Sequence, residues 1–121
     1  MSAERGKGSD IRDRAFTFAV RVIELHRFIY KSEPSLRSSS AQAASAAGSI
    51  GANLEEADAA QSRADFISKC NISLKEARES RYWLRILAQF VKSARVEALI
   101  AESTEIVAIL TTIVKKSRET K

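Results

Sequence analysis

Residues that break helices are scarce in this sequence. Its 121 residues include one proline, Pro34, and four glycines. A sheet sandwich needs many turns, and turns usually take these residues, so the scarcity favours a few long elements, as in a helical bundle. The single cysteine, Cys70, cannot form an internal disulfide. Because it lies within an apolar helical pattern, we expect a buried and unreactive thiol.

The motifs of common enzyme sites are also missing. The sequence has no GxSxG segment, no phosphate-cradling glycine loop and no second histidine beside His26. His26 lies at the edge of an apolar stripe, where a histidine packs more often than it acts as a base or a ligand. The ExxH spacing of di-metal helical bundles does not occur. We therefore expect a protein that is not an enzyme, with no catalytic residue, no metal site and no cofactor.

Long uninterrupted apolar runs are absent as well. The first apolar stretch, from Ala15 to Tyr30, contains two arginines, a glutamate and a histidine, so it fits neither a signal-peptide core nor a membrane span. With 45% hydrophobic and 29% charged residues, the composition is that of one ordinary globular domain. We expect a cytoplasmic protein without membrane contact.

Heptad-spaced apolar residues are abundant, in contrast. Steps of four and three alternate along the buried seam of a packed helix. The first segment shows this spacing at Ile11, Ala15, Phe18, Val22, Leu25 and Ile29. Similar patterns predict helices over about 10–31, 35–60, 62–91 and 96–117. The prediction is an all-α fold, an antiparallel up-down four-helix bundle over residues 10–118, between a flexible arm at 1–9 and a tail at 119–121.

Two residue patterns mark helix boundaries. Pro34 ends the first helix, because the residue before a proline avoids the helical conformation. Ser62, three residues before Asp65, is typical of an N-cap whose hydroxyl accepts a hydrogen bond from an otherwise unbonded backbone N–H. In the second helix, Gly48 and Gly51 lie beside a seam made mostly of alanine, and we expect a close helix contact there to offset their low helix propensity.

Some helices have apolar faces that are wider than one seam. In the first helix, Ile23 and Tyr30 widen the apolar arc to roughly 160°, against about 100° for a helix that docks on one side only. The third helix has a second apolar strip, formed by Ile72, Trp83, Ile86 and Phe90. We expect Trp83 and Phe90 to lie in the core or in an interface, and we expect the protein to form a homo-oligomer.

Charge is unevenly distributed along the chain, whose formal net charge is +5. Residues 61–95 carry eight basic side chains against three acidic ones, while residues 41–60 carry three acidic and no basic side chains. On the third helix a polar, cationic stripe follows the spacing of four and three. It comprises Asn71, Lys75, Arg78, Tyr82, Arg85, Gln89 and Lys92.

This stripe has two interpretations. Lysine and arginine can neutralise phosphates while Tyr82 stacks on an unpaired base, so Lys75, Arg78, Tyr82, Arg85 and Lys92 are candidate nucleic-acid-binding residues. The alternative is a solvated helix face, with Lys75 and Arg78 paired to Glu79 or Glu56. Net charge alone does not distinguish them.

A set of polar side chains lies near the seams of the second and third helices. It comprises Asn53, Glu56, Glu76 and Glu79, together with Lys75. Buried charges are costly unless they are paired, so we expect a structural polar network that crosses the two helices and fixes their register. A carboxylate site for a metal or for acid–base chemistry is the weaker alternative, because no histidine accompanies these acids.

Two motifs resemble a known bacterial family. They are SIGANLEEA at 49–57 and KEARESRYWL at 75–84. Together they are similar to the four-helix bundle proteins related to the 23S rRNA intervening-sequence proteins, and to the accessory variability determinant of diversity-generating retroelements. The resemblance covers about residues 10–116. The first motif departs from the family pattern SIPANIAEG at Gly51, Glu55 and Ala57, which replace proline, alanine and glycine.

The resemblance implies a four-helix protomer without catalytic residues, often assembled into a ring of five, a homopentamer. For retroelement accessory proteins it further implies binding to RNA and to a reverse transcriptase. Our hypothesis is therefore a non-catalytic helical assembly module that binds RNA, another single-stranded nucleic acid or a nucleic-acid enzyme. The alternative is a protein-binding oligomeric scaffold with no nucleic-acid role.

Overall fold

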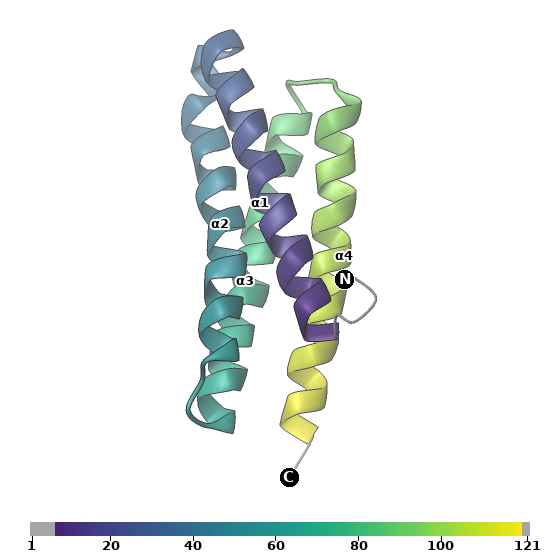
Figure 1. Ribbon diagram of the computed structural model, residues 1–121. Helices are drawn as coiled ribbons and strands as arrows, with labels where there is room; N and C mark the ends of the chain where they lie inside the picture. Colours follow the sequence, from purple (N-terminus) through teal and green to yellow (C-terminus); the bar gives the residue numbers. More distant parts are fainter. Residues whose placement is uncertain (1–6, 120–121) are drawn as a thin grey trace.

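The computed structural model describes residues 7–119, which form a bundle of four long helices without a β-strand (Figure 1). The elements are α1 (Lys7–Ser32), the short 3-10 helix η2 (Pro34–Leu36), α2 (Arg37–Asp58), α3 (Arg63–Ala88) and α4 (Ala94–Glu119). Successive helices run in opposite directions (Figure 1). This confirms the prediction of an all-α, up-down bundle.

Capping side chains set the starts of α3 and α4. As predicted, the hydroxyl of Ser62 accepts a hydrogen bond of 3.1 Å from the backbone N–H of Asp65. Ser93 has the same role before α4, because its Oγ accepts from the backbone N–H groups of Arg95 and Val96. The prediction from the sequence did not include this cap and placed the start of the helix at 96. The helix begins at Ala94.

The other boundaries also differ from those expected, by one to three residues. Helix α1 begins at Lys7, within the expected arm, and residues 1–6 lie outside the described residues. Helix α2 ends at Asp58 and α3 at Ala88, two and three residues early. In both cases the following N–H groups bond to carbonyls three residues back, as in Phe90 to Leu87, and this tighter turn ends the α-helix.

One buried stripe from each helix builds the core. The α1 seam from Ile11 to Ile29 is at most 3% exposed at every predicted position. Side chains of the other helices close the core, among them Ile50, Leu84 and Leu110, all fully buried. Burying each large apolar side chain contributes about 1.5–3 kcal/mol, so these seams account for the cohesion of the bundle.

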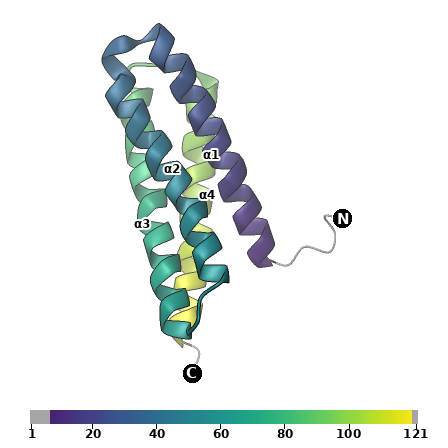
Figure 2. The same ribbon diagram turned by 60° about the vertical axis from the view of Figure 1, so that its left-hand side comes forward.

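Helix α1 lies mainly against α2 and has less contact with α4. Its N-terminal half leans away from the other helices, as the turned view shows (Figure 2). A bidentate pair ties this half to α4, since Arg14 donates to Glu102 through Nε at 3.0 Å and Nη2 at 2.8 Å. Near the other end, His26 hydrogen-bonds Ser40 of α2 and contacts the Tyr30 ring edge-on. His26 is therefore a packing residue, as expected.

The expected close packing at the two α2 glycines is wrong at Gly48. A Cβ built on Gly48 would meet no atom within 4 Å, so this glycine faces open space. A Cβ on Gly51 would lie 3.7 Å from the Cβ of Ala15, an ordinary van der Waals contact. The alanine-rich seam already brings α1 and α2 together, and neither position requires glycine.

Candidate nucleic-acid interface

The cationic stripe lies on an exposed side of α3. Lys75, Arg78, Tyr82 and Arg85 are all exposed, and Tyr82 shows 54% of its surface. Gln89 and Lys92 fall in the connection after α3, because this helix ends at Ala88. Lys92 stays close to the helix end, where its Nζ donates a hydrogen bond to the carbonyl oxygen of Ala88.

The stripe cations lack the acidic partners that the alternative interpretation assigns to them. Within residues 7–119, neither Lys75 nor Arg78 lies within 4 Å of a carboxylate oxygen. The partner of Glu56 is Lys69, at 2.9 Å, and this contact raises the pKa of Lys69. The charge of the stripe is therefore compensated by solvent and remains available to an anionic partner.

Separate contacts replace the expected polar network between α2 and α3. Asn53 donates to the carbonyl oxygen of Ser49 on its own helix, and Glu79 accepts from the Trp83 indole at 3.3 Å. Within residues 7–119, Glu56 is the one member of this set that pairs across the two helices, and its partner is Lys69. Long polar side chains near the helix surface reach solvent or a residue one turn away more easily than a partner across the seam.

Glu76 is the member of this set with a perturbed environment. It is half-buried, and burial raises its pKa, with a further increase from the nearby Glu79 carboxylate. Lys75 opposes the shift. A carboxyl with these neighbours costs stability when ionised, which fits a surface position that is short of donors rather than an acid–base site.

The aromatic residues of α3 form a small cluster beside the stripe. Tyr82 and Trp83 meet edge to face, with ring centroids 5.4 Å apart. Trp83 is half-buried against the core, whereas Phe90 is 66% exposed. Trp83 thus packs within the protomer, and the exposed Tyr82 ring lies against it.

Helix α4 brings two further cations beside the stripe that were not among the candidate residues. Lys115 and Arg118 line a hollow between α3 and α4 together with Arg78. In the sequence they read as basic residues at the negative end of a helix. Their position beside Arg78 depends on the register between antiparallel helices, which a single sequence does not reveal.

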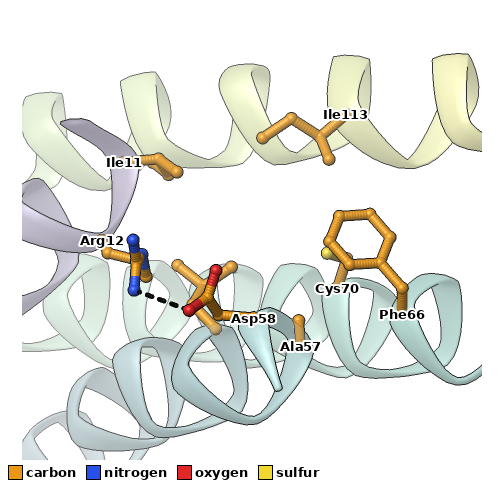
Figure 3. Close-up of a pocket in the computed structure, with 8 residues that line it drawn as sticks. Ile11, Arg12, Ala57, Asp58, Phe66, Cys70 and Ile113 are labelled. Atoms are coloured by element: carbon orange, nitrogen blue, oxygen red, sulfur yellow. Dashed lines mark ion pairs between the residues drawn. The ribbon is translucent and has the colours of Figure 1, made fainter. Parts of the chain in front are cut away.

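A separate apolar hollow, away from the stripe, lies where the N-terminal end of α1 meets α2, α3 and α4 (Figure 3). Its cavity volume is about 70 Å³, and its lining includes Leu54, Phe66 and Cys70. Among the lining residues, Arg12 pairs with Asp58 at 3.3 Å, so these two charges compensate each other. Such a space offers apolar surface but few polar groups to orient a ligand.

Cys70 is 2% exposed, and burial raises the pKa of its thiol. The expected burial of the thiol is confirmed, and a raised pKa lowers the thiolate fraction, as in an unreactive thiol. In the part of the chain that the structure describes, no three histidine, cysteine or acidic side chains gather at metal-binding distance. No helix within 7–119 is long and apolar enough to span a bilayer.

Both the sequence and the fold have counterparts among known proteins. The family model of the 23S rRNA-intervening sequence protein matches residues 7–112. A crystal structure of a protein of unknown function from the S23 ribosomal protein family of Bacteroides thetaiotaomicron VPI-5482 is 42% identical. That match covers 87% of this chain and 98% of the other, with a TM-score of 0.80. No curated protein matches the chain. The chain belongs to the 23S rRNA-intervening sequence protein family.

Proposed function

We propose that this protein is a non-catalytic, self-associating module whose α3 surface binds RNA. The observation that carries the proposal is the exposed stripe of Lys75, Arg78, Tyr82 and Arg85, whose cations have no carboxylate partner within residues 7–119. Lysine and arginine that approach phosphates release condensed counterions, which drives binding without reading sequence. An exposed tyrosine among them adds a surface for base stacking.

RNA is the first partner to test, since the family model is named for an intervening sequence of 23S rRNA. The resemblance to retroelement accessory proteins adds a reverse transcriptase as a second partner class. The neighbouring genes will show whether a reverse transcriptase is encoded beside this chain. A reverse-transcriptase gene there would direct the binding assays to that enzyme as well.

Self-association is supported by an apolar stripe on the outer side of α1. Its large side chains are Phe16, Val20, Ile23 and Tyr30, which are 70%, 40%, 45% and 51% exposed. Spacings of four, three and seven place them on one face, and this pattern suits another helix as the partner. A second copy of the chain would cover the stripe, with a ring of five as the assembly that the resemblance favours.

Oligomerisation and RNA binding reinforce each other in this proposal. Each copy presents one cationic stripe, so an assembly presents several at a fixed spacing. Linking several weak sites raises the overall affinity through a high effective concentration, without any new contact. A surface with few cations per protomer can in this way hold an RNA strand.

The test is retention of an RNA of mixed sequence on a filter at low salt. The variant Arg78→Gln/Arg85→Gln/Lys92→Gln should lose retention and keep the far-UV circular dichroism of the wild type. A charge-matched control is Lys31→Gln/Arg37→Gln/Arg63→Gln, which changes three exposed cations away from the stripe. Equal retention by the two variants would remove the α3 stripe from the function.

The second candidate is an oligomeric scaffold that binds only proteins. The exposed apolar stripe of α1 favours it, because such a stripe serves protein contacts regardless of nucleic acid. Under this alternative the wild type retains no RNA even at low salt, while sedimentation still reports an oligomer. The filter assay and sedimentation together decide between the two.

A further inference from the structure

Two hollows follow one another along the stripe side of α3. The first is an open hollow of about 420 Å³ between α3 and α4. Its lining residues are Asn71, Leu74, Arg78, Thr111, Val114, Lys115, Arg118 and Glu119. The second is an open hollow of about 240 Å³ and is lined by Tyr82, Arg85, Ile86 and Gln89. Arg78 and Tyr82 are one helical turn apart, so the two hollows are consecutive.

We propose that these hollows form a continuous track for a single strand of nucleic acid, which is bound by α3 and α4 together. The inference rests on the proposed function and deepens it by naming the form of nucleic acid and by adding α4 to the site. Phosphates lie in the first hollow, and a base lies on Tyr82 in the second.

The first hollow has the composition of a phosphate site. Arg78, Lys115 and Arg118 are exposed at its edges, and Glu119 is the one acid among its lining residues. Beneath them, Leu74 and Val114 are 6% and 4% exposed and give an apolar floor. Cations above an apolar floor can neutralise the backbone while the sugar rings contact the floor.

The second hollow has the composition of a base site. Tyr82 is 54% exposed, and its ring meets that of Trp83 edge to face. Arg85 and the amide of Gln89 share the hollow and can hydrogen-bond a base edge. Stacking on an aromatic ring tolerates any base, because every base has a π-face.

The aromatic contact is what selects a single strand. In a duplex the faces of the bases are stacked on one another, so Tyr82 would have no exposed face to meet. A duplex could still touch the cations through its phosphates, but it would lose the second hollow. Single-stranded RNA should therefore bind more tightly than the same sequence in duplex form.

Fluorescence anisotropy with the full-length chain tests this track. The probes are a labelled single-stranded RNA and its duplex, each titrated at several salt concentrations. For Lys115→Gln/Arg118→Gln, the negative slope of log affinity against log salt should become less steep by about 1.4 for the single strand, since each lost phosphate contact removes about 0.7. The matched control Lys31→Gln/Arg37→Gln should keep the wild-type slope.

Tyr82 gives the second arm of the same experiment. Tyr82→Ala should weaken single-strand binding by about 5- to 150-fold, and Tyr82→Phe should retain most of it, because stacking needs the ring and not the hydroxyl. Duplex binding should change little in either variant. Circular dichroism melting verifies that both variants fold.

The possible failures are distinguishable. If Lys115→Gln/Arg118→Gln behaves like the control while Arg78→Gln/Arg85→Gln/Lys92→Gln still loses RNA, the function stands and the α3–α4 track is wrong. Equal affinity for duplex and single strand would also overturn the track. If the wild type binds no RNA at low salt, the proposed function fails, and the track fails with it.

Discussion

The hydroxyl of Ser73 on α3 donates a hydrogen bond of 2.8 Å to the backbone carbonyl oxygen of Ile50 on α2. Two turns further along α3, Ser80 makes the same kind of contact to the carbonyl oxygen of Ala43, at 3.4 Å. Both serines are fully buried. Small hydroxyl side chains thus let the two helices approach closely while each polar group is satisfied, and they fix the register between α2 and α3.

The Ser73 contact leads to the first prediction. Ser73→Ala removes the donor without leaving a new polar group unpaired, so the free energy of unfolding should fall by about 1 kcal/mol. Ser73→Val adds volume to a full site and should cost about 1–3 kcal/mol. Urea denaturation measures both, with the exposed Ser68→Ala as a control that should change little. A smaller loss for Ser73→Val than for Ser73→Ala would contradict this packing.

The second prediction concerns the glycines of α2. Gly48→Ala should raise the free energy of unfolding by about 0.5–1 kcal/mol, because alanine has the higher helix propensity and its Cβ enters open space. Gly51→Ala should also be stabilising, since its Cβ makes only an ordinary contact with Ala15. Thermal and urea unfolding check both variants. Destabilisation by Gly48→Ala would mean that a partner covers this position.

Much of the fold could be predicted from the sequence, because periodicity is local information. The seam from Ile11 to Ile29 is buried as expected, and the Ser62 cap forms as expected. The errors arose where a helix boundary or a packing contact depends on several residues at once. Ser93 was missed as a cap, and Gly48 was assigned a close contact that the alanines around it already supply.

The third prediction follows from the raised pKa of Glu76. Burial raises it above the usual value of 4.5, and Glu79 adds to the effect. A carboxyl whose pKa is higher in the folded state stabilises the fold below its unfolded pKa, and this contribution is lost as pH rises through the folded pKa.

Glu76→Gln keeps the neutral form at every pH. The variant should therefore be more stable than the wild type at pH 7, and the difference should vanish below about pH 4. Urea denaturation at a series of pH values measures this, with the exposed Glu97→Gln as a control. A variant less stable than the wild type at pH 7 would show that ionised Glu76 has a stabilising partner.

The fourth prediction uses Trp83, the only tryptophan of the chain. Its ring contacts Tyr82, so RNA that stacks on Tyr82 should change the intrinsic fluorescence of Trp83 in a saturable way. Because Trp83 is half-buried, Trp83→Ala should cost about 2 kcal/mol, less than the roughly 3–5 kcal/mol of a fully buried tryptophan. RNA binding without any fluorescence change would place the strand away from Tyr82.

The candidate site was less predictable than the fold. Spacing on one helix was enough to find Lys75, Arg78, Tyr82 and Arg85, because a helix carries its own geometry. Contacts with residues of other helices could not be predicted. Glu56 pairs with Lys69, and Lys115 and Arg118 of α4 lie beside Arg78, because side-chain reach and helix register decide these contacts.

The fifth prediction concerns self-association. Val20→Glu/Ile23→Glu places two charges in the exposed stripe of α1 and should convert the oligomer to a monomer, because burying unpaired charges is costly. Sedimentation velocity measures the change, with Ala101→Glu on the exposed side of α4 as the control. A wild type that already sediments as a monomer would end the assembly proposal.

Photo-crosslinking of single-stranded RNA, followed by identification of the crosslinked peptides, tests most directly where RNA binds. We predict crosslinks within residues 71–92 of the α3 side, centred on Tyr82, and within 111–119 of α4, with their loss in Arg78→Gln/Arg85→Gln/Lys92→Gln. Crosslinks confined to α1 and α2, or none at a salt concentration where RNA is retained, would contradict it.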